Sequence, residues 1–146
     1  MADVHSPAQR SYNMSRIRSK DTGPEVRLRS LLHRSGLRFR LHGKELPGRP
    51  DIVLPAAKVA VFVHGCFWHR HWGCRYSSTP SSNVDFWEQK FGRTVERDQE
   101  NIQSLGDLGW AVIVAWECQV KGDPGGLVDR IKAAVEHRIG ERKPRG

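Results

Sequence analysis

Apolar runs along the chain predict four β-strands. Residues 110–116 (WAVIVAW) are almost all apolar, which is typical of a strand buried on both faces of a sheet. Two shorter runs, 51–55 (DIVLP) and 59–63 (VAVFV), predict strands joined by a tight turn near 56–58. A short strand is expected at 37–41. We expect the four strands to form one sheet.

Helical periodicity predicts helices around these strands. A helix is expected at 22–35, where leucines recur at helical spacing between an initial threonine and proline and a final glycine. A long helix is predicted at 83–105, a last one at 125–139, and a short basic one at 11–22. This order of elements predicts an α/β fold with a central mixed β-sheet flanked by helices.

The length of the chain fits one domain. It has 146 residues, and neither an internal repeat nor a linker divides it, so we predict a single domain over 1–146. Residues 1–20 form a polar, basic N-terminal segment. The basic tail at 140–146 is expected to be disordered.

Charge favours a polyanionic partner. Lys and Arg number 24 against 16 Asp and Glu, which gives a formal net charge of +8. This excess favours nucleic acid over an anionic membrane, although a merely soluble basic protein has the same charge. The apolar runs are shorter than the roughly 20 residues of a membrane span, and the start has no apolar signal-peptide region. We therefore expect no membrane association and a place in the cytosol.

The cysteines indicate a metal site. Cys66, His71 and Cys74 are closely spaced, and Cys118 follows the apolar run at 110–116. Three cysteines make a disulfide framework awkward, whereas a Cys3His set would hold a structural Zn²⁺ and join two distant segments. Three unrelated buried thiols are the alternative. On spacing alone, His64 or His69 could also replace His71 as the ligand.

Three acidic residues stand where a carboxylate is costly. Glu25 and Asp98 fall on the apolar sides of their predicted helices, and Asp51 opens a strand whose hairpin could bring it near His64. Each has an ordinary explanation: a first-turn acid for Glu25, a pair with an arginine for Asp98 and a turn residue for Asp51.

Together these residues indicate a metal-dependent phosphodiester hydrolase. Asp51 would hold Mg²⁺, which takes oxygen ligands and polarises phosphate. His64 or His69 would accept a proton from the attacking water, and a carboxylate would orient that histidine.

Aromatic residues add a nucleic-acid interpretation. Phe67 and Trp68 are consecutive within the predicted metal loop, and Trp87 begins the long helix. Adjacent aromatics are most often core, but on a basic protein beside these histidines they could enter or stack on bases.

Five motifs resemble one known family. They are SRIRSKDTGPE, LPGRPDIV, FVHGCFWHRH, FWEQKFGRTVERD and VIVAWEC, and they cover about residues 10–120 in order and with matching spacing. They are similar to the very short patch repair (Vsr) endonucleases. The resemblance implies a type II restriction-endonuclease-like core. It also implies nicking of DNA on the 5′ side of the thymine in T:G mismatches, which arise when 5-methylcytosine deaminates.

The resemblance implies roles for the candidate catalytic residues. Asp51 matches the magnesium-binding aspartate, His69 the general base, and His64 a residue beside the scissile phosphate. Glu25 and Asp98 match acidic residues associated with that centre.

It also implies the zinc and DNA contacts. The matching zinc ligands are Cys66, His71, Cys74 and Cys118, with one extra residue around Trp72 and Gly73. The matching DNA contacts are Phe67, Trp68 and Trp87, which intercalate from the major-groove side, Met14, which enters from the minor groove within the N-terminal segment 1–20, and the base-contacting Lys90.

Two positions depart from the family pattern. Val63 stands where the family has a threonine near Mg²⁺, and valine serves equally if the main-chain carbonyl is the ligand. Thr94 stands where the family has a base-contacting asparagine, so its shorter side chain could shift sequence preference. The family further implies a functional link to a cytosine-5 DNA methyltransferase and MutL-type mismatch-repair partners. Nothing in the chain suggests a dimer interface, so we expect a monomer.

Two other functions remain open at this point. A zinc-stabilised DNA-binding module without catalysis would explain the charge, the cysteines and the aromatics, but not the acids and spare histidines. A restriction-type endonuclease acting on paired DNA would use a D-x(n)-E-x-K motif. His64 stands in the lysine region of that motif, and the nearby Lys58 keeps this alternative alive.

Overall fold

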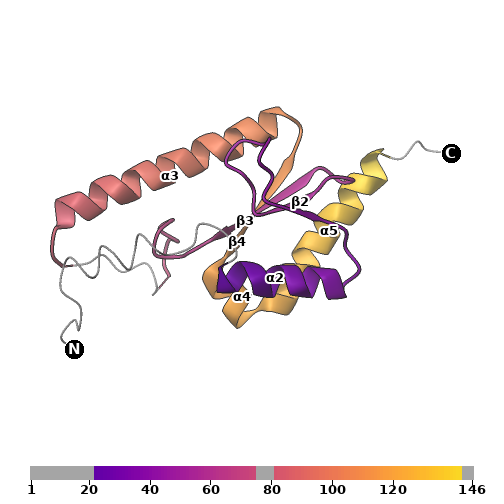
Figure 1. The fold of residues 1–146 in the computed structure, drawn as a ribbon, viewed down its shortest axis with the longest axis horizontal. Helices are drawn as coiled ribbons and strands as arrows, with labels where there is room; N and C mark the ends of the chain where they lie inside the picture. The colour runs from indigo at the N-terminus through magenta and orange to yellow at the C-terminus, as the bar shows by residue number, and fades with distance from the viewer. Residues whose placement is uncertain (1–21, 75–80, 143–146) are drawn as a thin grey trace.

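The computed structural model of the chain describes residues 22–74 and 81–142. In chain order the elements are α2 (Gly23–Arg34), β1 (Arg40–Leu41), β2 (Ile52–Leu54), β3 (Val59–His64), α3 (Val84–Asp107), β4 (Ala111–Trp116), α4 (Glu117–Gly122) and α5 (Pro124–Arg142) (Figure 1). The helix predicted at 11–22, with Met14, lies outside the described residues.

The strands form one mixed sheet, as predicted. Their order is β1-β2-β3-β4, with β1, β2 and β3 antiparallel and β3 parallel to β4. His64 pairs with Trp116 at the ends of the two parallel strands. The segments that follow β3 and β4 therefore leave the sheet at the same edge.

Alternation along β3 directs its side chains to two cores. Val59 and Val61 face a cluster that includes leucines of α2 and residues of α5. Ala60 and Phe62 face a smaller cluster with Leu105 of α3. Because side chains alternate along a strand, His64 lies on the α3 face of the sheet. The helices therefore flank the sheet on both sides.

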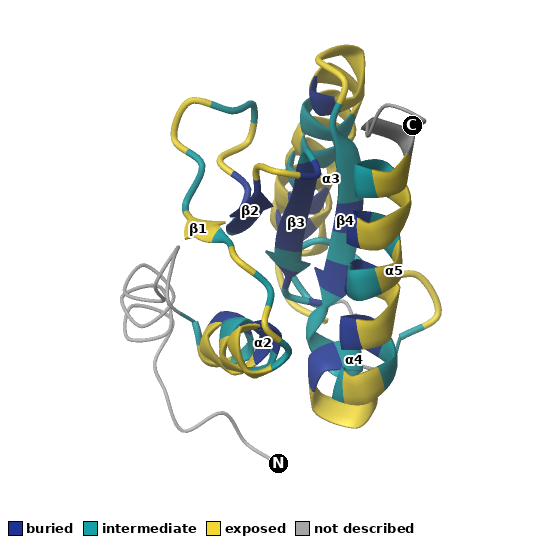
Figure 2. Cartoon of the chain, turned by 90° about the vertical axis from the view of Figure 1, so that its right-hand side faces the viewer, coloured by how far each residue is buried: buried dark blue, intermediate teal, exposed yellow. Residues whose placement is uncertain are grey.

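The strand buried on both faces is β3, not β4. Five of the six residues of β3 are buried, whereas β4 alternates between buried and half-buried side chains. Figure 2 shows β3 in the middle of the sheet and β4 beside it. The apolar run at 110–116 therefore predicted the strand correctly but its burial wrongly. A strand at the end of the order has one paired edge, and the sequence of the strand alone does not reveal that position.

Three other elements differ from the prediction. β1 contains two residues, since the backbone turns into the left-handed region at His42 (φ 53°). α4 was not predicted, because its six residues are too few to show helical periodicity. α5 continues to Arg142, so the prediction of a disordered tail was wrong for 140–142. Residues 143–146 lie outside the described part.

α2 begins as predicted. The Thr22 side chain accepts a hydrogen bond from the Glu25 amide, and Pro24 occupies the first turn. This cap determines where the helix starts, and it thereby places Glu25 at the end of the helix nearest the sheet residues described below. Within 22–74 and 81–142, none of the helices is both long and apolar enough to span a bilayer.

Candidate active site and metal centre

An open cavity of about 800 Å³ lies where α2 begins, β3 ends and α3 passes. Its walls include the start of α2, the segment 42–51, the end of β3, the loop at 65–69 and the middle of α3. All five predicted catalytic residues line it: Glu25, Asp51, His64, His69 and Asp98. The cavity therefore unites residues that lie more than 70 positions apart in the sequence.

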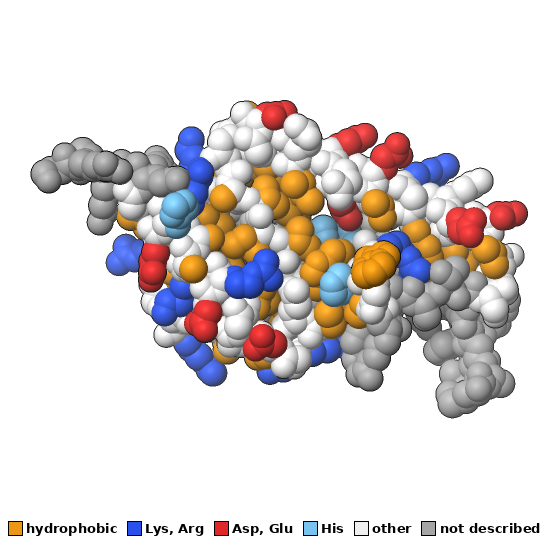
Figure 3. Space-filling model, turned by 180° about the vertical axis from the view of Figure 1, so that it is seen from behind, with side chains coloured by type: hydrophobic (Ala, Val, Ile, Leu, Met, Phe, Trp, Pro, Cys, Tyr) orange, Lys and Arg blue, Asp and Glu red, His pale blue; other side chains and the backbone are white. Residues whose placement is uncertain are grey.

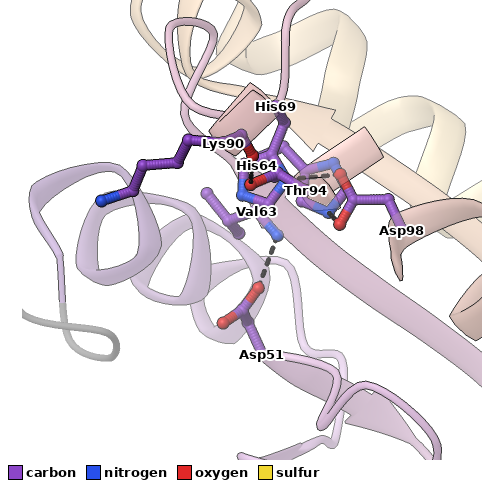
Figure 4. A network of polar contacts seen from close by, with 7 residues as sticks. All are labelled: Asp51, Val63, His64, His69, Lys90, Thr94 and Asp98. Carbon is purple, nitrogen blue, oxygen red and sulfur yellow. Dashed lines mark hydrogen bonds and ion pairs between the residues drawn. The ribbon is translucent and has the colours of Figure 1, made fainter. Parts of the chain in front are cut away.

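His69 and Asp98 form a close pair on one side of the cavity. Nδ1 of His69 lies 2.6 Å from Oδ2 of Asp98 (Figure 4). An ionised carboxylate only accepts hydrogen bonds, so the imidazole donates from Nδ1 and leaves Nε2 able to accept a proton. Within residues 22–74 and 81–142, Asp98 is paired with histidine and not with an arginine, so the ordinary explanation considered for it does not apply there.

His64 completes this group. Its ring stacks on that of His69, with centroids 3.8 Å apart and planes 3° from parallel. Its Nε2 lies 3.9 Å from Oδ1 of Asp98. Burial and the nearby His69 together lower the pKa of His64 to about 4, and Asp98 opposes both effects. His64 is therefore a neutral imidazole at neutral pH.

Asp51 and Glu25 form a second group. Oδ2 of Asp51 accepts a hydrogen bond from the amide of Val63 at 2.7 Å (Figure 4). Glu25 is only 3% exposed, although it stands in the first turn of α2. Burial, together with the charge and hydrogen bond of Glu25, raises the pKa of Asp51 to about 8, although the hydrogen bond from Val63 opposes the rise. Two carboxyl groups this close hold either a proton or a cation between them.

His42 joins this second group, and the sequence analysis did not single it out. One ligand atom from each of Glu25, His42 and Asp51 lies within 4.8 Å of the others. The missing signal was strand pairing. Leu41 pairs with Ile52, so the next residue of each strand, His42 and Asp51, must meet. Oxygen and imidazole donors at this spacing fit a divalent cation.

The hairpin does not bring Asp51 into the histidine group. Ile52 pairs with Val61, so Asp51 stands beside the end of β3, where its carboxylate contacts the amide of Val63, whereas His64 contacts His69 and Asp98. The cavity, and not direct contact, brings the two groups together. Lys58 lies in the turn before β3, at the end of that strand away from His64. It is therefore not placed to complete a restriction-type motif with Asp51.

The four predicted zinc ligands also come together. The ligand atoms of Cys66, His71, Cys74 and Cys118 all lie within 4.8 Å of one another. Nδ1 of His71 is 3.7 Å from Sγ of Cys66 and 3.4 Å from Sγ of Cys118. A tetrahedral ion with ordinary zinc–ligand lengths separates neighbouring S and N atoms by about 3.6 Å. The donor set therefore fits a tetrahedral metal ion, and His71 is the histidine that joins it.

Backbone hydrogen bonds shape the loop that carries this cluster. The amide of His71 donates to the carbonyl of Cys66 at 3.0 Å, and that of Cys74 to His71 at 3.2 Å. Trp72 and Gly73 form an outward turn, where Trp72 is 94% exposed and Gly73 has a φ of 71°. The turn therefore leaves the four donors together while Trp72 projects into solvent.

Trp116 separates the Cys/His cluster from the histidines of the cavity. Its ring stacks on His71, with centroids 4.3 Å apart and planes 11° from parallel. It also meets the edge of His64 at 5.3 Å. The Cys/His cluster on one side of this indole therefore supports the position of His64 on the other.

The predicted DNA-contacting aromatics form one cluster with α3. Phe67 contacts the edges of Trp68, Trp87 and Phe91, with centroids 5.1–5.7 Å apart. Phe67 and Trp68 are half-buried, whereas Trp87 is 7% exposed. Trp87 therefore supports the other two rings from beneath in this structure. Figure 3 shows hydrophobic side chains beside histidine on one face of the molecule.

The remaining predicted DNA contacts lie on α3. Nζ of Lys90 stands 5.2 Å above the ring of Trp68. The hydroxyl of Thr94 donates to the carbonyl of Lys90 at 3.1 Å, and Thr94 lines the cavity. Arg70, which the sequence analysis did not single out, stacks on Phe91 at 4.1 Å and donates to the carbonyl of Phe67 at 3.2 Å. This arginine ties the loop to α3.

Comparison with known proteins gives consistent matches. The family described as DNA mismatch endonuclease Vsr matches residues 2–75. The chain is 48% identical over 136 residues to the type II nicking enzyme V.XorIIP of Xanthomonas oryzae pv. oryzae, covering 93% of this chain and 98% of that protein. It is 48% identical over 122 residues to the DNA mismatch endonuclease Vsr of Escherichia coli K12, covering 84% of this chain and 78% of that protein. It is 45% identical over 141 residues to V.NmeAIP of Neisseria meningitidis, covering 92% and 100%.

These matches define the class first: the protein is a DNA endonuclease, and DNA is its substrate. Within that class, the chain belongs to the Vsr family of DNA mismatch endonucleases. The resemblance in the sequence motifs is thereby confirmed.

Proposed function

We propose that the protein nicks duplex DNA on the 5′ side of the thymine in a T:G mismatch, in a Mg²⁺-dependent reaction. The observation that carries the proposal is the cavity itself. A histidine–aspartate pair and a carboxyl pair open into the same space from different sides. Hydrolysis of a phosphodiester needs both a proton acceptor and a site for a divalent cation.

Asp51 and Glu25 are the residues that would hold Mg²⁺. Their carboxylate oxygens are the ligands that Mg²⁺ prefers, and the main chain of Val63 lies beside them. Bound Mg²⁺ supplies polarisation of the phosphate and stabilisation of the leaving oxygen. A valine in place of the family's threonine is compatible with a role for the main chain.

His69 is the proposed general base. Asp98 fixes the ring through Nδ1, so that Nε2 can take a proton from the attacking water. His64 is held by its stack on His69 and is neutral at neutral pH. A neutral ring beside the phosphate can accept or donate a hydrogen bond, and it adds no charge to the cavity.

The aromatic cluster is the proposed mismatch contact. Phe67 and Trp68 would unstack the bases beside the mismatch, supported by Trp87, with Lys90 and Thr94 nearby on α3. Met14, which lies outside the described residues, would enter from the minor groove. Lys44, Arg49 and Arg97 line the cavity and favour binding of the phosphate backbone.

The proposed Zn²⁺ site holds the loop that carries Phe67 and Trp68 in place. Cys66, His71, Cys74 and Cys118 would bind Zn²⁺ with no open position, which is typical of a structural site. We also propose that the mixed sheet is a restriction-endonuclease-like core, since the carboxylate at the start of β2 and the end of β3 build the cavity together.

The biological setting follows from the family. Repair of deaminated 5-methylcytosine would link the protein to a cytosine-5 DNA methyltransferase in the bacterial cytosol, with MutL-type proteins as partners and the enzyme as a monomer. The relatives are described as a mismatch endonuclease and as nicking enzymes, which disfavours a DNA-binding module without catalysis.

The test is strand cleavage of three end-labelled duplexes, with and without added Mg²⁺. One carries T:G within 5′-CT(A/T)GG, one the matched C:G, and one T:G in an unrelated sequence. Mg²⁺ is omitted and not chelated, because a chelator would also remove Zn²⁺.

We expect a single Mg²⁺-dependent nick 5′ of the mismatched thymine in the first duplex. The third duplex measures how far nicking depends on the sequence around the mismatch. Cleavage of the matched duplex at an equal rate would contradict mismatch specificity, and tight mismatch binding without any nick would contradict the proposed catalysis.

A further inference from the structure

His42 stands directly opposite Asp51 across the β1–β2 pair. The amide of His42 donates to the carbonyl of Asp51 at 3.1 Å, and the amide of Gly43 donates to Pro50 at 2.9 Å. These bonds continue the antiparallel pairing by two residues beyond Leu41 and Ile52. Opposed residues in such a pair carry neighbouring side chains. The position of His42 relative to Asp51 is therefore set by backbone pairing and not by a loose loop.

The imidazole of His42 reaches the carboxyl pair. One of its ring nitrogens lies within 4.8 Å of a carboxylate oxygen of both Glu25 and Asp51. All three residues line the same cavity, Glu25 is almost fully buried, and His42 is half-buried. A ligand that reaches the carboxylates from the cavity therefore also reaches His42.

The backbone of His42 adopts a conformation that is unfavourable for a residue with a Cβ. Its φ of 53° is in the left-handed region, which glycine adopts freely and which histidine adopts less often. Four other non-glycine residues in the described part of the chain share such a φ, so the backbone alone does not single out His42. The position of its imidazole beside two carboxylates at a cavity does.

We propose that His42 is a nitrogen ligand of the divalent cation at Asp51 and Glu25, so that this position binds Mn²⁺ or a similar transition-metal ion more tightly than Mg²⁺. An all-oxygen site suits Mg²⁺, whereas an imidazole adds affinity mainly for the transition metals. The inference rests on the proposed function only in that Asp51 holds the catalytic cation. It adds a ligand and a metal preference that the catalytic proposal does not contain.

The test is Mn²⁺ binding to the zinc-loaded protein without DNA, followed by electron paramagnetic resonance. Electron spin echo modulation detects the ¹⁴N nuclei of an imidazole that coordinates Mn²⁺. The variant is His42→Asn, since asparagine tolerates a left-handed φ and lacks the imidazole nitrogen. His33→Asn on the exposed side of α2 is the matched control.

We expect ¹⁴N modulation in the wild-type protein and in His33→Asn, and its loss in His42→Asn. Loss of an outer-shell partner of a metal ligand typically weakens metal binding by about 10- to 100-fold. Loss of the ligand His42 itself should weaken Mn²⁺ binding by at least as much. Mg²⁺ binding, measured by titration calorimetry, should change by less than about threefold. A purely structural role for His42 would weaken both ions alike and would overturn the proposal.

A second variant locates the nitrogen. His64 and His69 form another group that could hold a metal ion with Asp98. The double variant His64→Gln/His69→Gln should keep the ¹⁴N modulation if His42 is the ligand. Its loss in the double variant, with retention in His42→Asn, would assign the ion to the other group and overturn the proposal.

The two proposals can fail separately. Mismatch nicking by a protein that shows no ¹⁴N modulation from His42 would overturn the inference and leave the proposed function standing. Modulation from His42 in a protein that nicks no duplex would support the metal ligand and contradict the proposed function.

Discussion

His69 in the loop after β3 and Asp98 on α3 are joined at 2.6 Å between Nδ1 and Oδ2. The contact spans 29 positions of the sequence and connects the loop that carries the Cys/His cluster to the long helix. It decides which nitrogen of His69 is available for a proton. Under the proposed mechanism, proton transfer at His69 therefore depends on the packing of α3 against the loop.

Asp98→Asn is predicted to slow nicking without weakening mismatch binding. An amide cannot stabilise the protonated imidazole as a carboxylate does, and it can fix the wrong tautomer. General-base catalysis contributes about 10²–10⁴-fold, so we expect the single-turnover rate to fall by about 10²-fold or more. Glu100→Gln, an exposed acid on the same helix, is the control. A single-turnover nicking rate for Asp98→Asn within threefold of wild type would show that the His69–Asp98 pair does not contribute to catalysis.

His64 is predicted to make the protein sensitive to acid. Its pKa is lowered by burial from 6.5 to about 4, so the unfolded chain takes up a proton before the folded one does. The stability present above pH 6.5 is lost as the pH falls from 6.5 to 4, by at most about 3 kcal/mol.

Urea denaturation at pH 7 and pH 5 checks this dependence. His64→Gln should lose less stability than wild type over this interval, while His33→Gln, whose side chain is exposed, should follow wild type. Metal loss in acid affects all three proteins, so the difference between them is the quantity to compare. An equal loss in His64→Gln and wild type would contradict the assignment.

Cys118→Ser is predicted to remove the metal and to destabilise the fold. Cys118 is the one donor of the cluster that lies beyond β4, so its loss separates the loop after β3 from α4. We expect less than one Zn²⁺ per chain by elemental analysis and a loss of about 2 kcal/mol or more in the free energy of unfolding. A variant that is fully loaded and as stable as wild type would exclude Cys118 as a ligand.

Trp68→Ala is predicted to weaken mismatch binding. Stacking of an aromatic side chain on a base contributes about 1–3 kcal/mol, so we expect the dissociation constant to rise by about 5- to 150-fold. Trp72→Ala is the matched control, because Trp72 belongs to the same loop but is 94% exposed and lies at the outward turn. Equal effects of the two substitutions would show that Trp68 has no special place in the interface.

Much of the site could be predicted because its residues break the pattern of their elements. Glu25 and Asp98 stand on apolar stripes, and both turn inward in the structure. Cys66, His71 and Cys74 were predictable for a different reason: close spacing in a loop leaves these donors free to converge. The convergence of Cys118 with them depends on the parallel pairing of β3 and β4.

What was not predicted depends on the order of strands in the sheet. His42 is an ordinary loop residue until β1 pairs with β2 and brings it opposite Asp51. The burial of β3 and the partial exposure of β4 depend in the same way on which strand lies at the edge. Trp116 acquires its place between His64 and His71 only when β4 runs parallel to β3. Long-range pairing of this kind leaves no periodic signal in one sequence.

The most direct test of the central claim, that this cavity is the active site, compares nicking and mismatch binding of Asp51→Ala with those of wild type. Asp51 lies beside Val63 and Glu25, apart from the aromatic cluster. Its loss should therefore abolish the Mg²⁺-dependent nick while the dissociation constant for a T:G duplex stays within about threefold. Nicking at the wild-type rate by folded Asp51→Ala protein would contradict the account, as would loss of mismatch binding together with the nick.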